Sequence, residues 1–196
     1  MSVRPVQKAD IPAVAKMLSR AFADDPFLNW FLRKDAGRDA GSDIFFTIAL
    51  ELALPHGQAV VTDDLGGAAL WFPPGTWKMG LWQQLKLVPR MASAIGWKRL
   101  PWVVRHLDKV ISKHPREPHR YLYILGVDPV HQGRGVGGTL MGPAMAECDR
   151  ARLPSYLETS KERNLGFYQR QGYRVRDEVV LPPDVKIWTM WREAPK

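Results

Sequence analysis

Residues 120–138 read RYLYILGVDPVHQGRGVGG, and this stretch decides the fold. The run Arg120–Val127 is aromatic, branched and unbroken, which predicts a β-strand. A glycine-rich loop follows, and Gly137–Arg150 is predicted to be helical. Glycines let a ligand approach the backbone closely, and the first N–H groups of a helix point at an anion there. The stretch therefore predicts a phosphate-binding loop, to which Arg134 could add a cation.

A dinucleotide-binding loop is a competing interpretation. Gly133, Gly135 and Gly138 match the pattern Gly-x-Gly-x-x-Gly, and Glu158 falls near the spacing of a ribose-binding acid. Two features count against it. Residues 128–132 separate the strand from the glycines, and little chain remains for further βα units. The sequence has no Gly-Lys-Ser/Thr here, so a P-loop is excluded.

Hydrophobic periodicity and turn residues divide the rest of the chain into helices and strands. The predicted strands are Val3–Val6, Gln58–Val61, Ala68–Phe72, Tyr156–Thr159, Tyr173–Val180 and Val185–Trp191. The predicted helices are Ile11–Phe22, Phe27–Phe31, Ser42–Leu54, Leu165–Gln171 and two between Lys78 and His114 that break near Gly96 and Pro101. Asp10 is the expected N-cap of the first helix. Alternating strands and helices in the second half indicate a mixed α/β sheet.

Composition indicates one globular domain over residues 1–196. No apolar run is long enough for a membrane-spanning helix, and the N-terminus lacks the apolar segment of a signal peptide. A single cysteine, Cys148, excludes an intrachain disulfide and fits a reducing compartment. We therefore expect a cytoplasmic protein without a membrane partner.

The formal charge of +8 is compatible with nucleic acid, with an anionic ligand or with a solvated basic surface. Much of the basic character lies in Lys78–His114, which also contains Trp82 and Trp97. This segment could bind a membrane surface or nucleic acid. We favour two packing helices with solvated basic faces. The histidines show no metal-ligand spacing, so no metal is expected.

Two motifs carry a resemblance to a known family. Val127-Asp128-Pro129, followed by Gln132-Gly133-Arg134-Gly135-Val136-Gly137, resembles the acyl-CoA loop of the GCN5-related N-acetyltransferase (GNAT) superfamily. That loop reads Gln/Arg-x-x-Gly-x-Gly/Ala after a strand. The strand Tyr156–Thr159, then Asn164, Phe167-Tyr168 and Gly172-Tyr173, is similar to a later motif of the family. The order and spacing of both motifs fit.

The resemblance is clear from about residue 121 to 176 and looser before it. Segments 22–30 and 71–75 also look like the branch that includes puromycin acetyltransferase-like enzymes. The family implies a central mixed, mostly antiparallel sheet of about six or seven strands, flanked by helices and splayed at the acyl-CoA site. Residues 75–116 would form a helical insertion near the acceptor site.

The resemblance also implies an activity. It predicts an N-acyltransferase that moves acetyl from acetyl-CoA to a primary amine of a small molecule, by direct attack in a ternary complex. The family implies a monomer or homodimer without a nucleic-acid partner. Three alternatives stay open: a catalytically silent CoA- or nucleotide-binding sensor, an enzyme that acetylates a protein amine, and a nucleic-acid-binding module.

Carried over residue by residue, the resemblance predicts the cofactor site. The end of the strand, at Leu125, Gly126 and Val127, would bind the pantetheine arm, and the Val127 N–H is a candidate oxyanion donor. The pyrophosphate would lie on Gln132, Gly133, Arg134, Gly135, Val136, Gly137 and Gly138. Asn164 and Tyr168 would touch the same ligand.

Tyr168 matches the tyrosine that acts as general acid toward the CoA thiolate in this family. With a pKa of about 10, against about 8.5 for a thiol, it is protonated at neutral pH. The alternative is a core aromatic residue. Cys148 is interpreted as a small packing residue, because a covalent mechanism would need an activating neighbour that the sequence does not show.

Glu158 is the candidate general base, acting directly or through a water on an amine that must lose a proton. The alternative is a structural carboxylate paired with an arginine. His119 and Tyr123 are weaker candidates for the base. Asp24 and Asp25 precede the second helix, where they could bind a cationic amine or cap that helix.

Overall fold

The computed structural model describes residues 2–56 and 58–195, in which seven strands form one sheet. Their order across the sheet is β1-β2-β3-β4-β5-β7-β6. The strands are β1 (Val3–Pro5), β2 (Ala59–Thr62), β3 (Gly67–Phe72), β4 (Arg120–Val127), β5 (Ser155–Thr159), β6 (Arg174–Leu181) and β7 (Val185–Arg192). Every neighbouring pair is antiparallel except β4 and β5, which are parallel. This confirms the predicted mixed, mostly antiparallel sheet.

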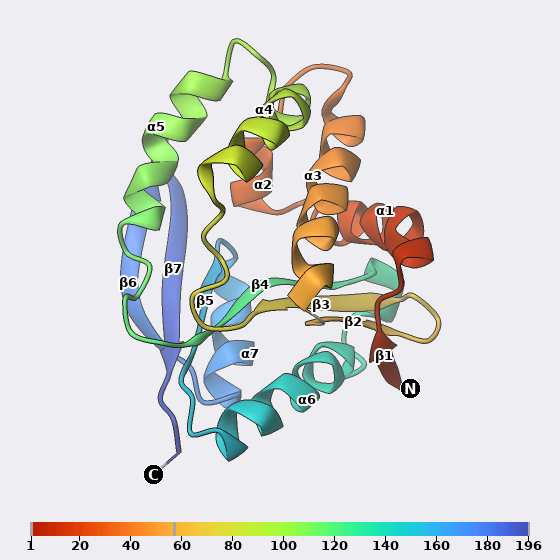
Figure 1. Cartoon of the computed structure of the whole chain (residues 1–196), viewed down its shortest axis with the longest axis vertical. Coiled ribbons are helices and arrows are strands. Elements are labelled where there is room, and N and C mark those ends of the chain that lie inside the picture. The colour runs from red at the N-terminus through yellow and green to blue at the C-terminus, as the bar shows by residue number, and fades with distance from the viewer. Residues whose placement is uncertain (1, 57, 196) are drawn as a thin grey trace.

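Helices cover both faces of the sheet. They are α1 (Ile11–Ala21), α2 (Pro26–Phe31), α3 (Arg38–Ala53), α4 (Leu81–Ile95), α5 (Leu100–Ile111), α6 (Val136–Arg150) and α7 (Leu165–Arg170). Figure 1 shows α1 to α5 on one side and α6 and α7 on the other. Each side has its own apolar core, so the sheet separates two layers of packed side chains.

One predicted helix start was wrong, and one predicted N-cap is confirmed in position only. Helix α3 begins at Arg38 rather than Ser42 because its first turn is polar and the apolar pattern does not reach it. Asp10 occupies the N-cap position of α1 without capping it through its side chain. Its carboxylate instead accepts a hydrogen bond from the Gln7 N–H at 2.8 Å and pairs with Arg4 at 2.6 Å.

Strand β4 carries a β-bulge that the sequence did not predict. Leu70 of β3 pairs with Ile124, whereas the next residue, Trp71, pairs with Leu122. Tyr123 is therefore an extra residue that breaks the alternation of the strand. As a result, Tyr123 and Ile124 both pack toward the core on the α1–α3 side of the sheet.

Strands β4 and β5 diverge after a short paired stretch. Their pairing runs from Arg120 with Ser155 to Leu122 with Leu157. Over residues 123–127, β4 has no partner on the β5 side within the described chain. This gap is the splay that the family resemblance implied. Apart from the Val127 carbonyl, which accepts from Gln132, it leaves backbone N–H and C=O groups free to bind a ligand.

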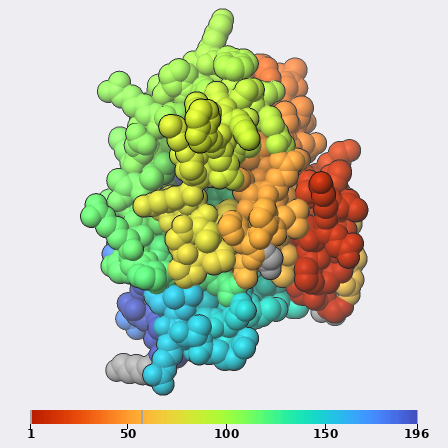
Figure 2. All heavy atoms as spheres, in the orientation of Figure 1, coloured from red at the N-terminus to blue at the C-terminus, as the bar shows by residue number. Residues whose placement is uncertain are grey.

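Helices α4 and α5 lie between β3 and β4 in the chain, which confirms the two helices predicted between Lys78 and His114. Gly96 ends α4 with a left-handed backbone, φ +93°. The solvent-facing side of this helical segment was predicted to be basic, but it also exposes large apolar side chains. Leu81 is 68% exposed and Trp82 is 78% exposed. In Figure 2, the yellow atoms of this segment lie across the visible face next to the orange atoms of α3.

Candidate active site

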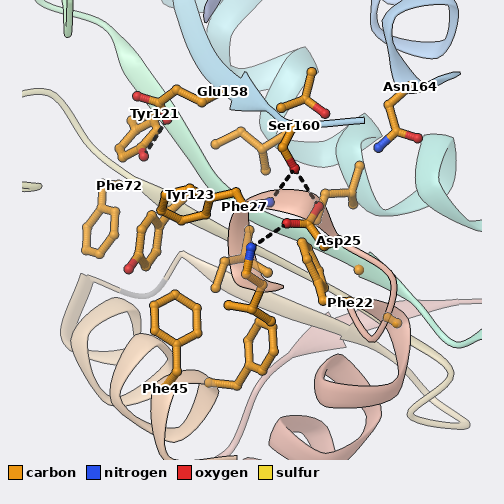
Figure 3. A pocket seen from close by; sticks show the side chains of 18 of the residues that line it. Phe22, Asp25, Phe27, Phe45, Phe72, Tyr121, Tyr123, Glu158, Ser160 and Asn164 are labelled. Carbon is orange, nitrogen blue, oxygen red and sulfur yellow. Dashed lines mark hydrogen bonds between the residues drawn. The ribbon is translucent and has the colours of Figure 1, made fainter. Parts of the chain in front are cut away.

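A cavity of about 1430 Å³ runs through the gap between β4 and β5. One end is lined by β4 and the glycine loop, and includes Leu125, Gly126, Val127, Gln132, Gly133, Gly135, Val136, Gly137, Asn164 and Tyr168. The other end is lined by α2, α3, α5 and the neighbouring strands, and includes Phe27, Phe45, Phe72, Trp77, Leu107, His114, Tyr121 and Tyr123. Glu158, Asp25 and Ser160 also line the cavity, and Figure 3 shows several of these side chains facing it.

The glycine loop has the geometry of an anion site. Gly133 and Gly135 have φ values of +76° and +80°, a left-handed conformation that strongly favours glycine. Gly135 is the N-cap of α6 and has no side chain to cap it. The first N–H groups of α6 are therefore available to a ligand. A Cβ at either glycine would meet no protein atom within 4 Å, so the open space beside the loop can admit a phosphate.

Side-chain and backbone hydrogen bonds hold the loop in place. Gln132 Nε2 donates to the Val127 carbonyl at 2.9 Å, so this side chain braces the strand end. The Asp128 N–H donates to the Gly66 carbonyl at 2.8 Å, and Arg20 Nε donates to Asp128 Oδ2 at 3.0 Å. These contacts fix the turn between β4 and α6 without using the N–H groups of α6.

Most of the residues predicted to bind the cofactor line the cavity, with two exceptions. Arg134 and Gly138 lie outside the lining, and the Arg134 side chain is exposed. The loop lines the cavity at Gly133 and Gly135, whereas Arg134, between them, faces outward. The roles of Arg134 and Gly138 remain predictions.

Tyr168 lies on α7 and is buried at the cavity wall. Its ring packs against Phe167, with 5.1 Å between the centroids, and against Tyr173, with 6.1 Å. Burial raises the pKa of Tyr168, and the nearby charge of Asp25 raises it further. The hydroxyl therefore stays protonated throughout the neutral range and can donate a hydrogen bond.

Glu158 projects from β5 toward β4, with its side chain 18% exposed. The Tyr121 hydroxyl donates to Glu158 Oε2 at 2.6 Å (Figure 3). Burial raises the pKa of Tyr121 well above its ordinary value, which keeps it a donor. His114 Nδ1 lies 3.7 Å from Glu158 Oε1. The alternative of a structural pair with an arginine is therefore wrong: tyrosine and histidine occupy that position.

His114 is a site residue that the sequence reasoning missed. It follows α5, lines the cavity and places Nε2 3.0 Å from Nε2 of His119. His119 Nδ1 lies 2.6 Å from the Glu117 carbonyl, so it carries a proton and Nε2 accepts from His114. Desolvation by burial lowers the pKa of His119, which favours this neutral ring. His114 then turns Nδ1 toward Glu158.

Asp25 ties two elements together at the middle of the cavity. Its Oδ1 accepts from the Leu28 N–H at 2.9 Å, which caps α2, and its Oδ2 accepts from the Ser160 hydroxyl at 2.8 Å. Desolvation by burial raises the pKa of Asp25. Asp24 instead forms a surface ion pair with Lys161. The cap predicted for this pair of aspartates is confirmed at Asp25.

Three findings concern metal ligands, membrane-spanning helices and the cysteine. Across residues 2–56 and 58–195, no three His, Cys, Asp or Glu side chains are grouped so that they could hold a metal ion. The same residues include no helix with the length and apolar character to cross a membrane. Cys148 is buried in α6, and burial raises the pKa of its thiol, as expected for a packing residue.

Comparison with known families agrees with this geometry. Residues 99–175 match the family model described as an acetyltransferase (GNAT) domain. This segment of the chain resembles a GNAT domain, and it includes β4, the glycine loop and α7. The narrower resemblance to puromycin acetyltransferase-like enzymes stays a prediction.

Known proteins resemble this chain either over a short segment of sequence or in the overall fold. The chain is 36% identical to a mycothiol acetyltransferase of Propionibacterium freudenreichii over 73 residues, which cover 36% of this chain and 23% of that protein. The chain thus spans about a quarter of that relative's length. A Corynebacterium glutamicum structure described as "histone acetyltransferase HPA2 and related acetyltransferase" has a TM-score of 0.76 at 23% identity, covering 100% of this chain and 97% of the other. A Drosophila melanogaster polyamine N-acetyltransferase has a TM-score of 0.64 at 16% identity, covering 97% and 98%.

Proposed function

We propose that this chain is an acetyl-CoA-dependent N-acetyltransferase that acts on a primary amine of a small molecule. The observation that carries the proposal is one continuous cavity, which joins the glycine loop to Glu158 through the gap in the sheet. A thioester in the gap would place its carbonyl beside the end of β4, and an amine could reach it from the other end. Holding two reactants in one cavity supplies much of the rate of such a reaction.

The residues of the chain fit acetyl-CoA, which supplies the activated acetyl group. The N–H groups of the first turn of α6, with Gly133 and Gly135, suit the pyrophosphate. The free backbone edge over residues 123–127 suits the amides of the pantetheine arm. Arg163 and Arg170 add positive charge to the same wall.

The protein groups have distinct roles in the transfer. The amine nitrogen attacks the carbonyl carbon, so that a C–N bond forms and the C–S bond breaks. Glu158 accepts the proton that the ammonium group loses before attack, and the Val127 N–H stabilises the negative oxygen. The nitrogen loses its second proton to solvent after the C–N bond has formed. Tyr168 donates a hydrogen bond to the departing thiolate. Because its pKa is raised above that of a thiol, full proton transfer is unfavourable, and solvent finally supplies the thiol proton.

A small acceptor fits better than a protein amine because α4 and α5 cover the acceptor end, where Trp77, Leu107 and His114 line the cavity. The fold neighbour from Drosophila melanogaster acts on a small polyamine, which agrees with an acceptor of this size.

The proposal is tested by calorimetric titration with acetyl-CoA, followed by thiol release with a mixture of primary amines. We expect binding, and turnover that Tyr168→Phe reduces without weakening the binding. Binding without turnover by the unaltered protein would indicate a sensor. Absence of binding would overturn the proposal.

A further inference from the structure

The acceptor end of the cavity is walled by aromatic rings. The ring centroids of Phe72 and Tyr123 are 5.4 Å apart, and those of Tyr121 and Tyr123 are 5.8 Å apart. Phe45 of α3 points at Tyr123 from across the cavity (Figure 3), and its side chain is only partly buried. Trp77 closes the side next to the insertion. Such rings offer a flat apolar guest a large contact area in edge-to-face or offset-stacked arrangements.

Only one carboxylate on the cavity wall is placed to receive an ammonium group. Among the described residues that line the cavity, the acids are Asp25 and Glu158. Both oxygens of Asp25 already accept hydrogen bonds, from Leu28 and Ser160. Glu158 keeps 18% of its side chain exposed and accepts one hydrogen bond from Tyr121. It therefore has lone pairs left for a cation.

The charge of the wall disfavours a guest with several cations. Within the described part of the cavity wall, Glu158 is the one carboxylate with lone pairs left for a cation, and Lys78 adds a positive charge. Each additional ammonium group of a polyamine or an aminoglycoside would enter without a carboxylate partner. An unpaired charge taken out of water is costly.

We propose that the acceptor is a primary monoamine on an aromatic body, whose ring packs among Phe45, Phe72 and Tyr123 while its ammonium group binds Glu158. This inference rests on the proposed acetyl transfer and narrows its substrate. The proton that leaves the ammonium group goes to Glu158. The same carboxylate thus positions the amine and deprotonates it.

The test compares initial rates of acetylation of 2-phenylethylamine, butylamine and spermidine at saturating acetyl-CoA. We expect kcat/KM for 2-phenylethylamine to exceed those for the other two amines by at least about 10-fold. Butylamine has no ring to pack against the aromatic wall, and spermidine brings additional ammonium groups that have no carboxylate partner. Thermal unfolding with CoA and each amine gives a second readout that needs no turnover. It should show the same order.

A pair of variants tests the aromatic wall. Phe45→Leu keeps an apolar side chain but removes a ring, and should raise KM for 2-phenylethylamine about 3- to 10-fold, with KM for acetyl-CoA unchanged. Trp97→Leu is the control, because Trp97 belongs to the same half of the molecule, is exposed and does not line the cavity. It should leave both constants unchanged.

The outcomes separate the two proposals. A preference for spermidine or butylamine would overturn the aromatic monoamine and leave acetyl transfer standing. An equal effect of Phe45→Leu and Trp97→Leu on the amine KM would also overturn it. Absence of any acetylated product, although acetyl-CoA binds, would overturn both proposals.

Discussion

Gly135→Ala is the perturbation whose effect on acetyl-CoA binding follows most directly from the structure. The new Cβ meets no protein atom within 4 Å, so it creates no clash in the free protein. The φ of +80° costs about 1–2 kcal/mol once a Cβ is present, which lowers Tm by roughly 2–8 °C. Gly75→Ala is a matched control: its φ is +76°, its surroundings are equally open, and it lies outside the cavity lining.

The two variants should differ only when ligand is present. Acetyl-CoA at about 100 times its Kd stabilises the unaltered protein by about 2.7 kcal/mol, or roughly 5–10 °C. In Gly135→Ala, the methyl group enters the open space where the phosphate is proposed to lie and displaces the phosphate from one N–H. Loss of that hydrogen bond, worth about 1.5–3 kcal/mol, weakens acetyl-CoA binding about 10- to 150-fold. At the same ligand concentration, only about 0.3–1.3 kcal/mol of stabilisation then remains.

Thermal unfolding with and without acetyl-CoA measures both effects. Gly75→Ala should keep the full ligand-induced shift in Tm, whereas Gly135→Ala should keep about 1–5 °C of it. A full shift in Gly135→Ala would refute the assignment of the phosphates to this loop. A reduced shift in both variants would mean that loop strain, rather than the ligand contact, was measured.

Three further predictions concern single residues. Tyr168→Phe should lower kcat at least about 100-fold with an unchanged Kd for acetyl-CoA, as measured by steady-state rates and titration; an unchanged kcat would show that its hydrogen bond to the thiolate is not needed for turnover. Asp25→Asn keeps both hydrogen-bonding partners, Leu28 and Ser160, through its amide. Because burial raises the pKa of Asp25 in the folded state, the native protein binds more protons than the unfolded chain, and stability falls as pH rises from about 4. The variant's Tm should therefore fall less between about pH 4 and 7, and equal slopes would contradict this. Gly126→Ala places a Cβ 2.4 Å from the Leu18 Cδ2 atom of α1 and should lower the free energy of unfolding by about 1–3 kcal/mol, as measured by denaturant unfolding. An unchanged midpoint would contradict this and show that α1 can shift.

Much of the fold was predictable because its signals are local. The apolar run of β4 and the glycines after it specify a strand, a loop and a helix start within one stretch of chain. Gly133 and Gly135 mark left-handed turns directly in the sequence, and the structure has both. The parallel pairing of β4 with β5 likewise follows from the helix between them.

The rest of the site depends on contacts between distant segments. The bulge at Tyr123 arises from the register against β3, which no local pattern of β4 reveals. His114 reaches Glu158 only because α5 returns to the sheet, and Ser160 reaches Asp25 across 135 residues of chain. The charge of a residue such as Glu158 suggested a base, but its partners could be identified only in three dimensions.

The central claim is that both substrates occupy one cavity and react directly, and initial rates with acetyl-CoA and amine both varied test it. Direct attack in a ternary complex predicts double-reciprocal lines that intersect, with no acetylated protein detectable by mass spectrometry when the amine is left out. Parallel lines, together with an acetyl group on a side chain such as Cys148, would contradict the account.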